Sequence, residues 1–359
     1  MKPLSRKEQF ALLFPTAPAF RLRQFEEALF DASLESFSSV SNIPIAMREK
    51  LDEKIPFLSV RPMHVLESVK KDTYKAIVAL VDKTQVETVL MKNARGQWTV
   101  CVSSQVGCAM GCTFCATGKM GLSRNLIADE IIDQVRFWNI FLYKKQQELS
   151  SVPESAPSEM GRISNVVFMG MGEPLANYDN VKETILTWLT YTDLGPTHIT
   201  VSTVGLLPML RKILTDPTWP AVRLAVSLHS ADSATRKAMM PSSFDTFLDE
   251  LVLWSEEYFE KNESRRRHLT FEYVMLSKVN DTEMHAKALI NFARRVGKVR
   301  INLIPYNFTG SVYRDSLPAD FERFETLLKE AGVTVTRRKT MGDDIAAACG
   351  QLIVEKEKK

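Results

Sequence analysis

From about residue 97 to residue 331, short apolar runs alternate with longer segments whose apolar residues recur at helical spacing. Runs rich in Val, Ile, Thr and Phe are typical of buried strands, and apolar residues three and four positions apart are typical of helices that cover a sheet. The pattern predicts strands near residues 98–103, 165–170, 198–203, 223–228, 269–275 and 299–304. It predicts helices near residues 126–148, 179–191, 207–215, 244–260, 281–296 and 319–331.

Six strand–helix units in a row indicate an α/β fold with a parallel sheet and right-handed crossovers. An ordinary closed barrel of this kind has eight units. We therefore expect an open, partial (βα)6 barrel, which we place at residues 94–342. The Ser/Pro/Glu-rich stretch at residues 149–163 interrupts the pattern and predicts a peripheral surface loop, for which the sequence suggests no role.

Residues 1–60 follow a different pattern and predict a small helical domain. Leu22, Phe25 and Leu29 recur at helical spacing, and Pro44 is typical of the first turn of a second helix. Basic and acidic side chains are mixed here, so charge alone does not separate an RNA contact from a solvated surface. The basic residues include Lys2, Arg6, Lys7, Arg21, Arg23, Arg48, Lys50 and Lys54.

Residues 61–93 are expected to form a short β extension between this helical domain and the barrel. Residues 74–91 (YKAIVALVDKTQVETVLM) predict two strands of a hairpin that turns at residues 82–84. Glu87 lies in the second strand, where a carboxylate usually faces solvent. The last segment, residues 343–359, is treated separately because it contains an isolated cysteine, Cys349, among small residues.

Polar motifs follow the predicted strands of the barrel at their carboxyl ends. In parallel α/β folds, ligands bind at that edge of the sheet. The pattern therefore predicts one binding site built from several loops. These motifs are the cysteine-rich loop after the first strand, MGMGEPL (169–175), STVG (202–205), SLHS (227–230) and NLIPYN (302–307).

Four of the five cysteines lie in CVSSQVGCAMGCTFCATG, residues 101–118. Cys108, Cys112 and Cys115 have the spacing Cys-x-x-x-Cys-x-x-Cys. Three thiolates in one short loop can bind three irons of a 4Fe-4S cluster and leave the fourth iron open to a further ligand. Structural zinc usually takes four ligands in paired motifs, and the sequence has no second pair of that kind. The spacing therefore favours a 4Fe-4S cluster.

Composition places limits on the setting of this chemistry. The chain has 359 residues and 45% hydrophobic content, enough for a large core. It has no uninterrupted apolar run of about 18 residues, and MKPLSRKEQF lacks the apolar region of a signal peptide. Cysteines clustered in a chain without export signals favour metal or redox chemistry in a reducing compartment. We therefore expect a cytoplasmic protein without membrane contact.

The net charge of +3 permits an RNA partner without indicating one, so any RNA contact has to come from local basic patches. Candidate clusters are residues 265–267, 294–295 and 337–339, each short enough to be an ordinary solvated run. We favour Arg337–Lys339, because phosphate contacts there would position a substrate near Cys349.

The cysteine spacing resembles the signature of the radical S-adenosylmethionine (SAM) superfamily, whose open iron binds the amino and carboxylate groups of SAM. The longer string through GLSRNL, together with AAACGQL near the C-terminus, resembles the RlmN/Cfr family of RNA adenosine methyltransferases. The resemblance extends from about residue 20 to residue 353. It implies a partial (βα)6 radical SAM barrel, and it implies that the N-terminal helical domain recognises RNA.

The same resemblance implies a set of SAM contacts at the ends of the barrel strands. From the residues alone, several of these polar side chains are equally well explained as caps of helices or turns. His229 has no metal-ligand partner nearby in the sequence, so we assign it no metal role. The implied SAM contacts are Gly172, Glu173, Ser202, Ser227, Leu228, His229 and Asn307.

Two cysteines remain beyond the cluster ligands. A lone buried cysteine usually behaves as a small apolar residue. The resemblance instead implies that Cys349 accepts a methyl group from one SAM, that a second SAM supplies the radical that activates this methyl group, and that the carbon then joins the adenine ring. It further implies that Cys101 releases the protein–RNA adduct by forming a disulfide with Cys349, and that Glu87 accepts a proton.

The resulting expectation is methylation at C2 of an adenosine in 23S rRNA, and in tRNA as a further substrate. An electron donor such as flavodoxin or ferredoxin and a thiol reductant are implied as partners, and a monomer is the default. A Cfr-type methyltransferase acting at C8 has the same cysteines and stays open. So does a non-methylating radical SAM enzyme, in which Cys349 would be dispensable, and a non-catalytic iron–sulfur protein that binds RNA.

Overall fold

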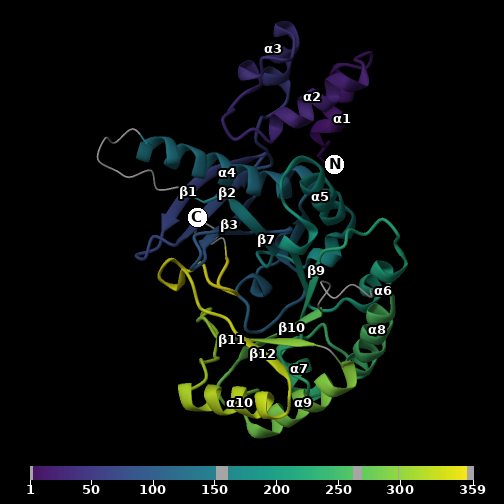
Figure 1. The fold of residues 1–359 in the computed structure, drawn as a ribbon, viewed down its shortest axis with the longest axis vertical. Helices are drawn as coiled ribbons and strands as arrows, with labels where there is room; N and C mark the ends of the chain where they lie inside the picture. The colour runs from purple at the N-terminus through teal and green to yellow at the C-terminus, as the bar shows by residue number, and fades with distance from the viewer. Residues whose placement is uncertain (1–2, 151–160, 262–268, 298, 354–359) are drawn as a thin grey trace.

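The computed structural model describes residues 3–150, 161–261, 269–297 and 299–353 (Figure 1). Its main sheet has ten strands in the order β1-β2-β3-β4-β7-β8-β9-β10-β11-β12, and β5 pairs with β6 in a separate sheet. The strands are β1 (Val60–Glu67), β2 (Thr73–Leu80), β3 (Gln85–Lys92), β4 (Trp98–Cys101), β5 (Gln105–Cys108), β6 (Gly121–Asn125), β7 (Ile163–Phe168), β8 (Ile199–Thr203), β9 (Arg223–Ser227), β10 (Leu269–Met275), β11 (Arg300–Pro305) and β12 (Thr334–Arg337).

Helices connect the parallel strands and lie along the outer side of the curved sheet (Figure 1). The α-helices are α1 (Arg6–Leu13), α2 (Ala19–Leu29), α3 (Ile45–Lys54), α4 (Ala128–Ser150), α5 (Tyr178–Tyr191), α6 (Leu207–Thr215), α7 (Ser233–Met239), α8 (Phe247–Lys261), α9 (Glu283–Val296) and α10 (Pro318–Glu330). The 3-10 helices are η1 (Phe37–Ser39), η2 (Thr117–Lys119), η3 (Pro174–Asn177), η4 (Pro196–His198) and η5 (Asp343–Ile345).

Every neighbouring pair from β4 to β12 in the main sheet is parallel, which confirms the predicted α/β class. The six predicted strands correspond to β4, β7, β8, β9, β10 and β11, and each is followed by a crossover helix before the next strand of the main sheet, with β5 and β6 of the small sheet lying between β4 and α4. The sheet continues by one further parallel strand, β12, which we did not predict. Its four residues are mostly exposed, so it lacks the apolar run that marks a buried strand. The short helix α7 was also missed.

The β extension is antiparallel and continues the barrel sheet beyond β4. The predicted hairpin is formed by β2 and β3, and Lys83 in its turn adopts a positive φ of 68°. β2 is buried along nearly its whole length, whereas β1 at the edge is mostly exposed. This explains why β2 and β3 could be predicted from their apolar residues and β1 could not.

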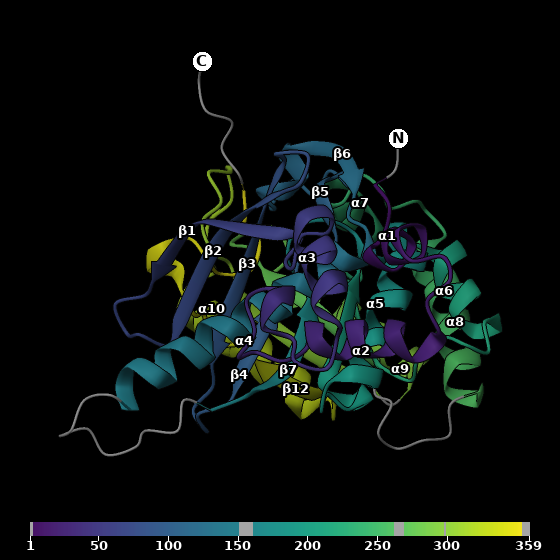
Figure 2. The same cartoon turned by 90° about the horizontal axis from the view of Figure 1, so that it is seen from above.

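The N-terminal helices α1 to α3 lie above α4 in Figure 1 and have a core of their own. Phe10, Phe25 and Phe37 are buried at its centre, and their rings pack in sequence at centroid distances of 4.9 and 5.2 Å. The helical nature of this region was predicted from Phe25 and its neighbours. Figure 2 shows the same helices over α4 and α5 when the molecule is seen from above.

A buried ionic network attaches the N-terminal helices to α4. The Nη1 atom of Arg6 lies 2.7 Å from the Oδ2 atom of Asp133, and Arg136 approaches the other oxygen of the same carboxylate at 2.5 Å. Asp133 also accepts a hydrogen bond from the backbone N–H of Ser59 at 2.6 Å. Arg6 is only 3% exposed, so it serves this network and is not available to RNA phosphates. Of the two alternatives left open for the basic residues of this region, an RNA contact and a solvated surface, neither applies to Arg6.

Three sequence predictions fall largely or wholly outside the described residues: most of the 149–163 loop, the Arg265–Arg267 cluster, and Lys2 among the basic residues of the N-terminal region. α4 reaches Ser150, two residues beyond the predicted end of that helix. In the part of the chain that the structure describes, no helix combines the length and apolar character needed to cross a bilayer.

Candidate active site

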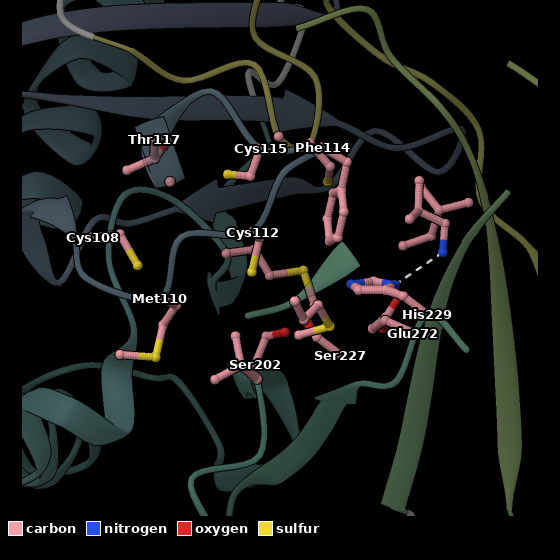
Figure 3. Close-up of a pocket in the computed structure, with 18 of the residues that line it drawn as sticks. Cys108, Met110, Cys112, Phe114, Cys115, Thr117, Ser202, Ser227, His229 and Glu272 are labelled. Carbon is pink, nitrogen blue, oxygen red and sulfur yellow. Dashed lines mark hydrogen bonds between the residues drawn. The ribbon is translucent and has the colours of Figure 1, made fainter. Parts of the chain in front are cut away.

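A cavity of about 990 Å³ opens at the carboxyl ends of the parallel strands (Figure 3). Its walls come from the cysteine-rich loop, the loops after β7, β8 and β9, strand β10 and the segment that follows β12. Eight of the predicted site residues line it together with Cys349: Cys108, Cys112, Cys115, Gly172, Glu173, Ser202, Ser227 and His229.

The cysteine-rich loop is held in a fixed conformation beside the cavity. Cys108 ends β5, and Cys112 and Cys115 follow in an irregular segment that packs closely against Gly118. A Cβ atom on Gly118 would lie 2.8 Å from the carbonyl oxygen of Cys112, so no side chain fits there. The backbone N–H of Thr113 donates to Met239 at 2.9 Å and fastens the loop to the end of α7.

The three thiols are free and face the same cavity. Burial raises the pKa of all three above the ordinary thiol value, that of Cys108 to about 11. Thiols of this kind become ligands when a metal replaces their proton. Among the described residues, no three His, Cys, Asp or Glu side chains converge on the position of one metal ion. A 4Fe-4S cube has separate corners, so three cysteines around a cavity fit this cluster without meeting at one point.

The Gly-Glu-Pro loop after β7 depends on a close backbone approach at Gly172. This glycine has a φ of 101°, and a Cβ atom on it would lie 2.5 Å from the Cβ of Gln105. Gln105 in turn accepts a hydrogen bond from the backbone N–H of Glu173 at 2.7 Å. The carboxylate of Glu173 accepts from Leu175 N at 2.9 Å and from Val204 N at 2.8 Å. Burial raises its pKa to about 7.

His229 is placed as a neutral side chain. Its Nδ1 atom accepts a hydrogen bond from the backbone N–H of Val274 at 3.0 Å, which leaves the proton on Nε2. Burial, with a smaller contribution from Arg236, lowers its pKa to about 3. The ring meets Phe114 edge-on at a centroid distance of 4.8 Å, and its second nitrogen points into the cavity in Figure 3. A neutral donor therefore faces the space between the cysteine-rich loop and β10.

Two of the predicted SAM contacts lie elsewhere. The lining of this cavity, as far as the structure describes it, includes neither Leu228 nor Asn307. Leu228 is fully buried, and its backbone N–H donates to the backbone carbonyl oxygen of Glu272 at 3.0 Å. The Nδ2 atom of Asn307 donates to the carbonyl oxygen of Cys349 at 3.2 Å, and its Oδ1 accepts from Thr340 at 3.1 Å. In this structure Asn307 therefore holds the cysteine segment near the C-terminus.

A second cavity of about 1010 Å³ adjoins the first. Cys101 lines only the second cavity, whereas Cys349 lines both. Both are free thiols; Cys101 is buried and Cys349 is exposed. The two cysteines left over from the cluster spacing are thus brought to one space, although they are 248 positions apart (349 minus 101). The walls shared by both cavities also include Met169, Ile304, Pro305 and Arg338.

The Arg337–Lys339 cluster, which we predicted to contact phosphates near Cys349, contributes one residue to the cavities. The guanidinium of Arg338 faces them, with Nη1 3.1 Å from the sulfur of Met169 and 3.6 Å from the Oε2 atom of Glu272. Burial raises the pKa of Cys101 to about 12, and the neighbouring Cys349 adds to this effect, whereas the positive charge of Arg338 opposes it.

Glu272 was missed altogether. It lies on β10 among apolar residues, is 3% exposed and lines the first cavity. Its Oε1 atom accepts from Asn302 at 2.9 Å. An acidic residue in an otherwise apolar central strand was a signal that could have identified it, because a buried carboxylate needs a partner.

Glu87, predicted as a proton acceptor, lies beside the cysteine segment and outside the described lining of both cavities. It is 1% exposed, and its Oε1 atom forms an ion pair with Lys75 at 2.9 Å. Its Oε2 atom accepts from the backbone N–H of Ile353 at 2.8 Å. Burial raises its pKa, and the contacts with Lys75 and Ile353 only partly offset this effect.

Comparison with known proteins places these features in context. The sequence profile of the radical SAM superfamily matches residues 102–289. A dual-specificity RNA methyltransferase named RlmN from Rhodopirellula baltica is 38% identical over 93% of this chain and 84% of its own length. The corresponding protein of Chlorobium phaeobacteroides is 39% identical over 95% of this chain and 91% of its own. A crystal structure of a radical SAM methyltransferase from Sphaerobacter thermophilus superposes with a TM-score of 0.85 at 33% identity and covers 97% of both chains.

Proposed function

Because the chain belongs to the RlmN family of radical SAM RNA methyltransferases, we propose that it methylates C2 of an adenosine in 23S rRNA, and that tRNA is a second substrate. The observation that carries this proposal is the pair of free thiols, Cys101 and Cys349, that lines one cavity beside the three clustered cysteines. An electron-poor ring carbon cannot take a methyl group directly from an electrophile such as SAM. A thiol that carries the methyl group overcomes this difficulty.

Cys108, Cys112 and Cys115 are the proposed ligands of a 4Fe-4S cluster, which supplies, when bound, the electron that splits SAM. Gly172, Glu173, Ser202, Ser227 and His229 are the proposed SAM contacts, because they face the same cavity as these cysteines. Leu228 and Asn307 complete the proposed set. The backbone N–H of Leu228 donates to the carbonyl oxygen of Glu272, and Asn307 donates to the carbonyl oxygen of Cys349.

Cys349 is the proposed methyl carrier. Its thiolate attacks the methyl carbon of one SAM, the carbon–sulfonium bond breaks and S-adenosylhomocysteine leaves. A second SAM is used to remove a hydrogen atom from this methyl group, and the resulting carbon radical bonds to the adenine ring. The ring radical formed in this way gives one electron to the oxidised form of the one-electron carrier, flavodoxin or ferredoxin, and loses the proton of the ring carbon, which restores the aromatic ring. The exposure of Cys349 supports this role, because the carrier has to meet both SAM and a base that is turned out of the RNA.

Cys101 is proposed to release the product. Its thiolate attacks the sulfur of Cys349, the bond from that sulfur to carbon breaks, and the released carbon keeps the electron pair and takes up a proton. A Cys101–Cys349 disulfide remains, which a thiol reductant returns to two thiols. Glu87 is the proposed acceptor of the proton lost from the ring carbon, and its raised pKa favours this role.

The proposal carries further requirements. Two molecules of SAM are used per turnover, and a one-electron donor such as flavodoxin or ferredoxin is needed. We propose that the protein acts as a monomer in the cytoplasm, where reducing partners can restore the thiols.

Product analysis tests this function. Holoprotein purified without oxygen is incubated with SAM, a reductant and ribosomal RNA that lacks the modification, and the RNA is digested to nucleosides for mass spectrometry. We expect 2-methyladenosine among the nucleosides. A product that co-elutes with 8-methyladenosine would instead identify the rival C8 activity, and 5′-deoxyadenosine formed without any methylated nucleoside would contradict both.

A further inference from the structure

Lys75 is a buried lysine to which the proposed reaction assigns no role. It lies in β2 between apolar neighbours, and its side chain is 8% exposed. The register of β2 and β3 places Ile77 opposite Glu87, so Lys75 is the diagonal neighbour of Glu87 on the same face of the sheet. The 2.9 Å ion pair between Lys75 and Glu87 follows from this placement.

Both members of the ion pair also contact the segment that carries Cys349. The Nζ atom of Lys75 donates to the carbonyl oxygen of Ala346 at 3.1 Å. The carboxylate of Glu87 accepts from the backbone N–H of Ile353 at 2.8 Å. Ala346 lies three residues before Cys349 and Ile353 lies four residues after it. One buried pair therefore holds the chain on both sides of the thiol.

The contact at Ala346 is made where the backbone needs support. Ala346 has a φ of 50°, a left-handed conformation that is unfavourable for a residue with a Cβ atom. Such a conformation persists only where the surroundings fix it. The ammonium group of Lys75 binds the carbonyl oxygen of this same residue. Lys75 is thus placed to fix the turn that directs the chain towards Cys349.

Stability alone does not explain a charge pair at this position. Apolar residues of similar volume usually stabilise a buried site at least as well as an ion pair, because the two charges lose their hydration. A charged pair adds directed hydrogen bonds. Here both additional hydrogen bonds lead to the Cys349 segment, which also joins the cluster loop through Ala116 N and the carbonyl oxygen of Gly350 at 2.8 Å.

We propose that Lys75 is a positioning residue, which together with Glu87 holds residues 342–353 so that Cys349 faces both cavities. This inference rests on the proposed role of Cys349 as methyl carrier. It deepens that role, since a thiol that has to meet SAM, an RNA base and Cys101 in turn needs a defined starting position.

The test compares Lys75→Met with the matched control Lys70→Met, which removes the same charge from an exposed position in the turn between β1 and β2. Hydrogen exchange is measured by mass spectrometry on full-length holoprotein. Because a hydrogen bond to a charged group is lost, we expect exchange of peptides covering residues 342–353 to rise by about tenfold or more in Lys75→Met, with β7 and β8 unchanged. Exchange in Lys70→Met should match the wild type.

Thiol reactivity and kinetics give two further readouts. We expect alkylation of Cys349 by iodoacetamide to change by at least about threefold in Lys75→Met, because the thiol loses its fixed surroundings. The kcat for RNA methylation should fall by about tenfold or more with little change in KM for SAM, because positioning and not SAM binding is lost.

Unchanged exchange of residues 342–353 in Lys75→Met would overturn the inference, whatever the activity. Should Lys75→Met fail to fold because Glu87 is left unpaired, the double variant Lys75→Met/Glu87→Gln removes both charges, and its exchange is judged by the same criterion. The exchange measurement requires no turnover. A wild-type protein that forms no 2-methyladenosine would thus refute the proposed function without deciding the role of Lys75.

Discussion

The guanidinium of Arg338 lies 3.6 Å from the carboxylate of Glu272, in the wall between the cavity of the clustered cysteines and the cavity of Cys101. Arg338 directly follows the edge strand β12, and Glu272 lies in the buried strand β10. Their pairing directs this cation, which the sequence analysis proposed as a phosphate contact near Cys349, towards the cavities. It also places a positive charge beside both thiols of the proposed reaction.

This placement leads to a prediction for thiol reactivity. Arg338→Met should raise the pKa of Cys101, because the positive charge that favours its thiolate is removed. At a fixed pH below that pKa, the thiolate fraction falls, and we expect alkylation of Cys101 to slow by about threefold or more. The rate is measured by mass spectrometry of the Cys101 peptide in holoprotein. Arg337→Met is the control, since Arg337 is exposed and stacks on Phe321 at 4.1 Å. Equal rates in both variants would refute the electrostatic role.

Alanine variants of Cys349 and Cys101 should lose RNA methylation at different steps. Cys349→Ala removes the proposed methyl carrier, so no methylated adenosine and no protein–RNA adduct should form. Cys101→Ala keeps the carrier but removes the thiol that releases it, so a covalent protein–RNA adduct should accumulate. Denaturing gel electrophoresis with labelled RNA measures the adduct. Methylation by Cys349→Ala at the wild-type rate would favour a different use of the SAM radical.

Gly172 should not tolerate a side chain. Alanine there combines a φ of 101° with a contact of 2.5 Å to Gln105, and we expect a cost of about 1–3 kcal/mol from the backbone conformation alone. Denaturant unfolding measures this cost, and calorimetry should show weaker SAM binding because the loop bearing Glu173 shifts. Gly195→Ala is a close control, since Gly195 has a φ of −79° and its Cβ would approach no nearer than 3.7 Å to His198. Similar stabilities of the two variants would contradict the close packing at Gly172.

The attachment of the N-terminal helices should depend on Asp133. Asp133→Asn leaves Arg6 and Arg136 without their shared carboxylate in a buried site, at an expected cost of about 3–5 kcal/mol. Hydrogen exchange of α1 and denaturant unfolding measure the effect. Asp193→Asn at an exposed ion pair is the control and should cost less than about 1 kcal/mol. A neutral result for Asp133→Asn would show that the apolar contacts alone hold the helices in place.

The same network predicts a pH dependence. Burial alone would raise the pKa of Asp133, but Arg136, Arg6 and the N–H of Ser59 outweigh it and lower the folded-state pKa. The unfolded chain then binds a proton at higher pH than the folded chain does. The stabilisation is therefore complete above the ordinary carboxyl pKa of about 4 and is lost as the pH falls below it. Wild-type exchange in α1 should rise in acid towards the level of Asp133→Asn, whereas the variant should change less over the same range.

The local sequence determined the strands and helices of the barrel and the loop that carries the three clustered cysteines. The apolar periodicity indicated six parallel strands and their helices, because burial on both faces of a sheet demands continuous apolar runs. The spacing of Cys108, Cys112 and Cys115 indicated one metal-binding loop, because ligands so close in the chain share one loop in any fold. Edge elements such as β1 and β12 escaped prediction, since exposed strands carry no apolar run.

Tertiary structure alone decided how the rest of the site is assembled. Lys75 reaches Ala346 across 271 positions, and Cys101 shares a cavity with Cys349 only because the segment after β12 returns over the barrel mouth. Arg337 and Arg338 are adjacent residues of the same type. Arg338 nevertheless faces the cavities, whereas Arg337 stacks on the ring of Phe321 at the surface. The periodicity of a sequence indicates which face of a helix or strand is buried. The partner of a buried charged side chain depends instead on which strand, distant in the sequence, lies beside it in the fold.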